Sequence, residues 1–207
     1  MDPDLLRRRR LLTVVVMMAT IMQALDGTIA NVALPNIQGS LSATQATCSW
    51  VITSYIVCAA IATPLAGFCA VRFGVRRILV SSVIGFTIAS MLCGAAQTLE
   101  QLVAFRALQG VCGAALVPLS QTLMMEAYRR EEQGKAMAMW GVGTMLGPIT
   151  GPTLGGWLTD DYSWRWVFYI NLPVGILCAV GLMILIKNKA ILRAEDTKLV
   201  KRRAHLR

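Results

Sequence analysis

The stretch from Gly27 to Val71 reads GTIANVALPNIQGSLSATQATCSWVITSYIVCAAIATPLAGFCAV and contains no Asp, Glu, Lys or Arg. A transmembrane helix needs about 20 mainly apolar residues, because every backbone polar group in hydrocarbon must be satisfied within the helix. This stretch is therefore long enough for two spans. Turn-forming residues gather between Pro35 and Thr47, so we expect a loop there between the two spans.

Further uncharged stretches of span length follow at Ile78–Leu99, Ala107–Met125, Ala136–Thr159 and Trp166–Ile186. The chain of 207 residues is 56% hydrophobic and only 15% charged, which is too apolar for an ordinary soluble domain. We therefore predict an all-α membrane protein with a six-helix bundle over residues 11–186. The expected spans are 11–34, 49–71, 78–96, 102–125, 136–157 and 166–186.

The net charge of +9 is explained by where the basic residues lie. Eighteen of the twenty precede the first span, lie in every second link, or follow the last span, which is the positive-inside pattern of a protein with both ends in the cytoplasm. Residues 1–10 then form a basic cytoplasmic N-terminus, and residues 187–207 a basic tail that we interpret as a truncated linker. The basic charge is therefore explained by the orientation of the chain in the membrane, and we expect no nucleic-acid partner.

The residues that membrane enzymes need are missing from the sequence. The chain has six cysteines without C-x-x-C spacing and a single histidine, His205. It contains no G-x-S-x-G, H-E-x-x-H or P-loop signature. We therefore expect no enzymatic activity, no metal site and no cofactor.

Asp26 is a carboxylate inside the otherwise apolar first span, in the segment Leu25–Pro35. Burying a charge at that depth costs at least about 2.5–3.5 kcal/mol, so Asp26 should face the bundle interior or a water-filled cavity. Such a carboxylate can load and release a proton. The alternative is a structural Asp that caps a helix break together with Gly27.

Arg106, in the fourth expected span, is a candidate counter-charge for Asp26. At about 1.5 Å per residue, Asp26 lies roughly 12 Å from the outer end of its span and Arg106 roughly 6 Å from the end of its own. Both belong to the outer half of the bundle, so a direct or water-bridged pair is allowed but not required. Alternatively, Arg106 braces neighbouring helices by bonding to their carbonyls.

The fifth expected span has glycine at every fourth position, which places these glycines on one helix face. The pattern consists of Gly143, Gly147, Gly151 and Gly155, with Pro148 and Pro152 interleaved and Gly156 following. Small residues let another helix approach closely, and prolines bend a helix by removing hydrogen bonds. We predict a close, kinked helix interface; generic helix packing would account for the glycines alone.

The link between the second and third spans, Gly67–Arg77, is a tight turn with three arginines. Its distinctive residues are Gly67, Arg72, Gly74, Arg76 and Arg77. Topology alone would account for the charge of this link.

These segments together resemble the major facilitator superfamily, and within it the fourteen-helix drug:proton antiporters of the EmrB/QacA type. The resemblance rests on five motifs that occur in order along nearly the whole chain: Leu25–Pro35, Gly67–Arg77, Leu102–Gly113, Gly143–Gly156 and Trp164–Gly175. It implies the N-terminal half of a proton-driven multidrug exporter in the bacterial cytoplasmic membrane. Implied partners are lipophilic, often cationic small molecules, protons, a periplasmic adaptor and an outer-membrane channel.

The same resemblance implies residue roles. Asp26 would act in proton coupling or substrate recognition and Arg106 in proton transfer, with Asn31 and Gln109 from the same two motifs beside them. The glycine face of the fifth span would form the interface with the other half of the transporter, and the Gly67–Arg77 link would stabilise one conformation. The chain departs from the link motif at Val71, where the family usually has Asp.

The chain ends where the family continues into linker helices and a second bundle, so we expect a fragment that carries half of a substrate site. A second hypothesis is an inactive or regulatory half-transporter that pairs with a full-length relative through an exposed glycine face. A third is a nutrient:proton symporter of the same fold.

Overall fold

The computed structural model describes residues 3–186, and this part of the chain is helical with short links and without strands. Its helices are α1 (Pro3–Ser40), α2 (Gln45–Cys48), α3 (Trp50–Phe73), α4 (Val75–Ala95), α5 (Leu99–Gly113), α6 (Leu116–Ala127), α7 (Gln133–Asp161), α8 (Trp166–Tyr169) and α9 (Asn171–Ile186). The predicted all-α fold is confirmed. The predicted basic tail 187–207 and the first two residues of the segment 1–10 lie outside the described residues.

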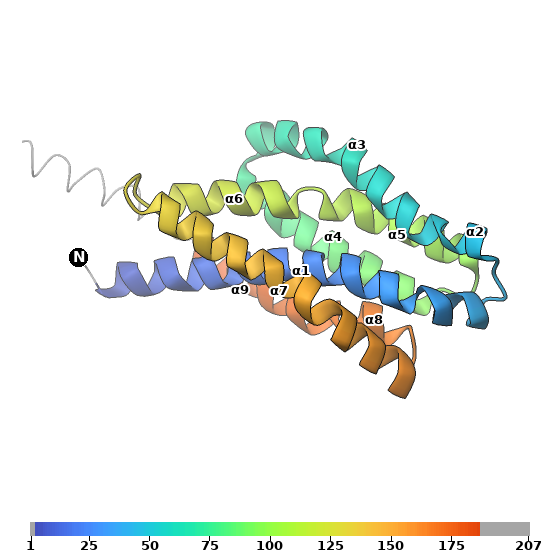
Figure 1. The fold of residues 1–207 in the computed structure, drawn as a ribbon. Coiled ribbons are helices and arrows are strands. Elements are labelled where there is room, and N and C mark those ends of the chain that lie inside the picture. The colour runs from blue at the N-terminus through green and yellow to red at the C-terminus, as the bar shows by residue number, and fades with distance from the viewer. Residues whose placement is uncertain (1–2, 187–207) are drawn as a thin grey trace, which may run out of the picture.

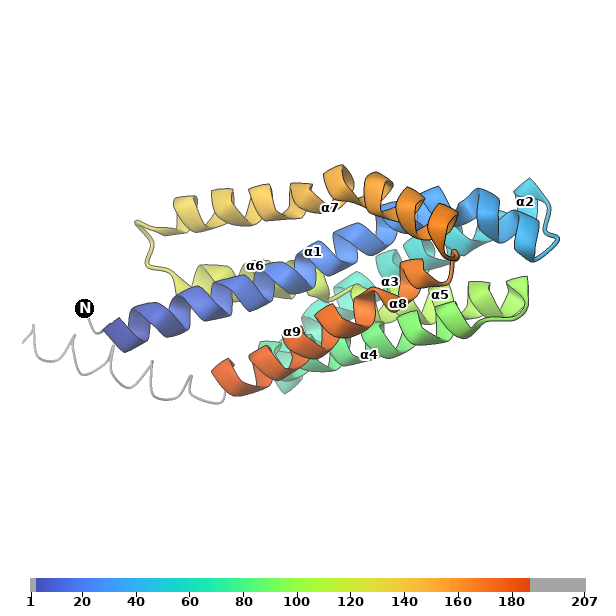
Figure 2. The same ribbon diagram turned by 90° about the horizontal axis from the view of Figure 1, so that it is seen from below.

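The helices form an elongated bundle in which α1 packs against α7 and α9, α3 against α5, and α4 against both α5 and α9 (Figure 1). Figure 2 shows the start of α1, the α6–α7 link and the end of α9 at one end of the bundle. The α1–α2, α4–α5 and α7–α8 links lie at the opposite end. The basic links therefore share one end, as the charge pattern predicts.

Two predicted spans are each interrupted by a short break next to a proline. The span predicted at 102–125 divides into α5 and α6, and Pro118 offers no N–H to the Ala114 carbonyl in the break. The span predicted at 166–186 divides into α8 and α9, and Pro173 likewise offers none to the Tyr169 carbonyl. Both breaks leave backbone carbonyls that other groups can use.

The first helix is longer than predicted, since α1 continues through Pro35 to Ser40. The loop expected over Pro35–Thr47 is therefore wrong in extent, because residues 41–44 alone separate α1 from α2. Ile37 explains the extension: it is fully buried in an apolar cluster, which holds the last turns of the helix in place. Thr44 then caps α2 through a reciprocal hydrogen-bond pair with Thr47.

Five segments of the described chain are long and apolar enough to cross a membrane: Arg7–Ser40, Gln45–Phe73, Val75–Ala95, Leu99–Ala127 and Trp166–Leu185. The predicted span 136–157 lies within α7, which is not among them although its 29 residues would suffice in length. The glycines, prolines and threonines of α7 lower its hydropathy. They serve close packing, as described below.

The interior contains two apolar clusters with a polar layer between them along α1. One cluster includes Val16, Ala19 and Met22 of α1, and the other includes Ile29 and Ala33. Asp26 lies between these two sets and is 1% exposed. The bundle therefore holds the Asp26 carboxylate of α1 in a polar layer between two apolar clusters.

Candidate functional site

Asp26 and Arg106 form a direct ion pair between α1 and α5. The Arg106 Nη1 atom lies 2.6 Å from Asp26 Oδ2, and the two side chains are 1% and 0% exposed. The pair that the sequence allowed but did not require is therefore present. The surrounding apolar clusters exclude water from it, so the two charges interact in a medium of low dielectric constant.

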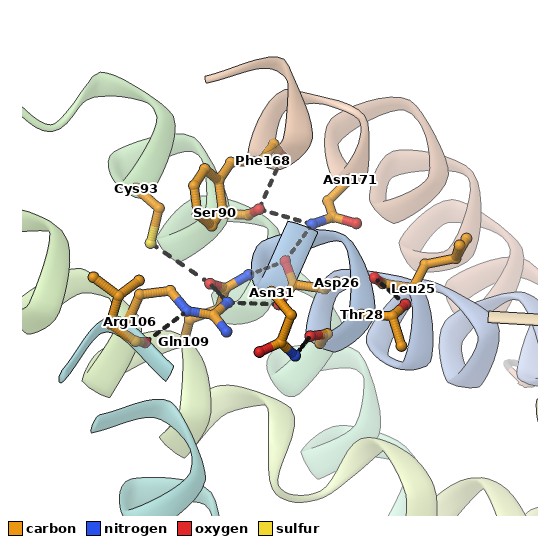
Figure 3. Close-up of polar contacts among 12 residues, drawn as sticks. Leu25, Asp26, Thr28, Asn31, Ser90, Cys93, Arg106, Gln109, Phe168 and Asn171 are labelled. Atoms are coloured by element: carbon orange, nitrogen blue, oxygen red, sulfur yellow. Dashed lines mark hydrogen bonds and ion pairs between the residues drawn. The ribbon is translucent and has the colours of Figure 1, made fainter. Parts of the chain in front are cut away.

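Two amide side chains complete the environment of the carboxylate (Figure 3). Gln109 Nε2 and Asn171 Nδ2 donate to Asp26 Oδ1 over 2.9 and 2.8 Å. Gln109 also accepts a hydrogen bond of 2.8 Å from Arg106 Nη1 through its Oε1 atom. Three elements, α1, α5 and α9, thus converge on one carboxylate, and both of its oxygens accept hydrogen bonds.

The Arg106 guanidinium also contacts α3 and α8. Its Nε atom donates to the Val51 carbonyl over 3.3 Å, so part of the bracing role considered as an alternative is present as well. The guanidinium carbon lies 4.2 Å from the centre of the Tyr55 ring and 5.8 Å from that of Phe168. These aromatic faces stabilise a cation that is fully buried.

The α5 sequence places this group of side chains. Arg106 and Gln109 are three residues apart and therefore lie on the same helix face. One residue further, a methyl group built on Gly110 would overlap the Tyr55 carbonyl oxygen. Glycine at this position lets α3 approach α5 closely enough for the Tyr55 ring to cover Arg106.

Asn31, a candidate from the sequence, is not part of this group. It is exposed, and its Nδ2 atom donates to the Gly27 carbonyl one turn earlier on α1 over 2.8 Å. Sequence reasoning instead missed Asn171 and its neighbour Ser90. The signal for Asn171 was available, since an amide within an apolar span calls for a partner in the same way as Asp26 does.

The glycine face of α7 packs on α1 beside Asp26. Methyl groups built on Gly147 and Gly151 would collide with Ala24 and Thr28, and the Thr28 hydroxyl donates to the Gly147 carbonyl over 3.3 Å. All of Gly143, Gly147, Gly151 and Gly155 are buried. The predicted close interface is present, and it lies within this chain.

This packing corrects two expectations. The glycine face is not the surface that α7 offers to another half of a transporter, and it is not exposed for pairing with a full-length relative. Pro148 and Pro152 are exposed and lie beside this face of α7, not on it. The surface left uncovered there carries Val142, Met145 and Ile149, each about two-thirds exposed at 68%, 65% and 68%.

The Gly67–Arg77 link, between α3 and α4, lies at the same end of the bundle as the N-terminus (Figure 1). Gly74 has a φ of 94°, a left-handed conformation that favours glycine, and it separates α3 from α4. Arg76 donates to the Met183 carbonyl of α9 over 3.3 Å. Arg72 and Arg77 are exposed, as is Val71 at 90%. Gly67 has open space around it.

Comparison with known proteins agrees with the fold and the motifs. The family model of the Major Facilitator Superfamily matches residues 16–206. The chain is 46% identical over 166 residues to the multidrug export protein EmrB of Haemophilus influenzae, covering 80% of this chain and 32% of that protein. It is 42% identical over 193 residues to EmrB of Escherichia coli K12, covering 93% of this chain and 36% of that protein.

A third relative has a different name. The fatty acid resistance protein FarB of Neisseria gonorrhoeae is 45% identical over 162 residues, covering 78% of this chain and 32% of that protein. The chain thus spans about a third of the length of these relatives. A family match over nearly the whole chain, together with a helical bundle that has five candidate membrane spans, shows that this multi-pass membrane protein belongs to the major facilitator superfamily.

Proposed function

We propose that this chain forms the N-terminal bundle of a transporter that exports lipophilic, often cationic compounds in exchange for protons. The observation that carries the proposal is the buried Asp26–Arg106 pair, which lies in a polar layer between two apolar clusters. The names of the relatives, multidrug export protein and fatty acid resistance protein, support export of apolar compounds. No chemical conversion of the compound is part of the proposal.

Asp26 would act by changing its charge. A proton or a cationic compound at the carboxylate would take the place of Arg106 as the positive partner of Asp26. The reason is that one buried carboxylate stabilises one counter-charge at a time. The proton gradient is a sufficient source of energy, since one charge moving through 100 mV yields about 2.3 kcal/mol. Gln109, which bonds to both side chains, would keep the carboxylate and the guanidinium correctly oriented toward each other.

The substrate would lie between this bundle and a second one. Transporters of this kind expose a midplane site alternately to each side by rocking one half against the other. The exposed apolar surface of α7 and the turn at Gly74 would then take part in that movement. We also propose the bacterial cytoplasmic membrane as the location, and a periplasmic adaptor and an outer-membrane channel as partners.

The direct test is transport by the intact protein in membrane vesicles with an imposed proton gradient and a fluorescent lipophilic cation. We expect substrate to move against the direction of the proton, and we expect Asp26→Asn to abolish gradient-driven transport. Asp160→Asn, at an exposed acidic residue at the outer end of α7, should transport as the unmodified protein does. Movement of substrate in the same direction as the proton would instead identify a symporter.

A further inference from the structure

The last span is broken at Ile170, immediately beside the Asp26 site. Helix α8 ends at Tyr169 and α9 begins at Asn171. Ser90 of α4 is fully buried and donates to the Phe168 carbonyl in the final turn of α8 over 2.8 Å. The end of α8 is therefore held by a side chain from another helix.

Asn171 connects this hydrogen bond to the carboxylate. Its Nδ2 atom donates to Asp26 Oδ1 over 2.8 Å and to Ser90 Oγ over 2.9 Å. The side chain is 2% exposed. Because an amide nitrogen carries two hydrogens, both are used, one in each direction. A continuous series of hydrogen bonds thus runs from Asp26 through Asn171 and Ser90 to the Phe168 carbonyl (Figure 3).

The first bond of this series depends on the charge of Asp26. A hydrogen bond to a carboxylate is roughly twice as strong as one to a neutral acceptor. When Asp26 is neutral, its oxygen still accepts from Asn171, but the hydrogen bond is weaker and the Asn171 side chain is held less firmly. The Asn171 hydrogen bond that orients the Ser90 hydroxyl toward the break is then held less firmly as well.

We propose that Asn171 is a positioning residue that transmits the charge of Asp26 to the break between α8 and α9. Neutral Asp26 loosens the break, and charged Asp26 holds it. The proposal rests on the proposed function only in taking Asp26 as the group that changes charge. By this proposal the last span of the bundle takes part in the response to a proton, although that span contributes no charge to the site.

Hydrogen–deuterium exchange of the intact protein at one fixed pH tests the link without substrate or gradient. Asp26→Asn removes the charge, and we expect it to raise amide exchange in residues 168–172 about tenfold. In an Asn171→Leu background the same change should alter exchange there by less than about twofold. An Asn36→Leu background, at an exposed amide of α1, should keep the tenfold response. An equal response in the Asn171→Leu and Asn36→Leu backgrounds would overturn the proposal.

A second pair of variants keeps the test decisive if Asp26→Asn does not fold. Ser90→Ala and Asn171→Leu interrupt the same series at neighbouring bonds, so each should raise exchange in residues 168–172. The double variant should raise it no further than the larger single effect. Additive effects, or increased exchange throughout α4 as well, would indicate a general loss of packing and would contradict a specific link.

Transport separates this inference from the proposed function. We expect Asn171→Leu to lower the maximal rate of gradient-driven transport about tenfold while KM changes less than about twofold, because the residue acts on the response and not on the substrate. If Asp26→Asn transports normally while the exchange response persists, the proposed function fails and the link stands. If Asp26→Asn abolishes transport but exchange at residues 168–172 is unchanged, the link fails alone.

Discussion

Gly147 of α7 lies directly against Ala24 of α1, two residues before Asp26. A methyl group built on Gly147 would lie 2.6 Å from the Ala24 Cβ atom and 2.9 Å from the Leu25 backbone nitrogen. Backbone atoms cannot turn aside as a flexible side chain can. The position of Asp26 in the bundle therefore depends on the absence of a side chain at Gly147.

Replacing Gly147 by Ala should destabilise the bundle by about 1–3 kcal/mol through overpacking. The control is Gly156→Ala on the same helix, where an added methyl group meets nothing within 4 Å. Because both changes gain the same helix propensity, their difference isolates the packing. Equilibrium unfolding in mixed micelles measures both variants, and equal stabilities would refute close packing at Gly147.

The turn at Gly74 should be sensitive for a different reason. Its φ of 94° lies where an L-residue is strained, although the space around it is open. We expect Gly74→Ala to cost about 1–2 kcal/mol, because the left-handed conformation brings Cβ close to a carbonyl oxygen. Gly67→Ala, also in open space but inside α3, should be neutral or slightly stabilising. The same unfolding measurement compares the two variants, and equal stabilities would contradict backbone strain at Gly74.

Arg165 caps the C-terminal end of α4. Its Nη1 atom donates to the Gly94 and Ala96 carbonyls over 2.7 and 2.6 Å, and a cation at a helix C-terminus also interacts favourably with the helix dipole. Arg165→Gln should therefore destabilise by about 1–3 kcal/mol. Arg129→Gln, at an exposed position in the α6–α7 link, should change stability by less than about 0.5 kcal/mol. A similar loss in both variants would exclude a specific role for Arg165.

Removing one partner of the buried pair should cost more than removing both. Arg106→Leu leaves the Asp26 carboxylate without its counter-charge in a dry layer, a loss of about 3–5 kcal/mol. The double variant Asp26→Leu/Arg106→Leu should recover a large part of that loss, because no charge remains to be compensated. A double variant that is less stable than Arg106→Leu alone would contradict this expectation. Unfolding of the unmodified protein, of Arg106→Leu, of Asp26→Leu and of the double variant gives the coupling energy.

The sequence predicts the features of this site that follow from the free-energy cost of a charge in lipid and from helical periodicity. Asp26 had to face the interior because exposure to lipid is expensive, and the glycines at every fourth position had to share a face. The Asp26–Arg106 pairing could not be decided, because depth counted from helix ends assumes that the ends are level. Helix α1 continues to Ser40, so that assumption does not hold.

Periodicity also could not identify the helix that packs against the glycine face of α7. The spacing of Gly143 to Gly155 predicts a close neighbour but not which helix it is; the neighbour is α1, from the same bundle. Asn171 lies inside the predicted span 166–186, where an amide calls for a partner, but spacing does not identify Asp26 as that partner. Asn31 has the expected sequence context, but its position on α1 turns its side chain away from the carboxylate, toward the Gly27 carbonyl.

The most direct test of the central claim is proton release on substrate binding, measured with a pH indicator on the intact purified protein in weakly buffered detergent solution. If Asp26 exchanges a proton for a cationic substrate, binding should release about one proton per substrate at a pH where the site is loaded, since one carboxyl group holds one proton. Asp26→Asn should release none, and Asp160→Asn should release as many as the unmodified protein. Proton release from Asp26→Asn equal to that of the unmodified protein would contradict the account.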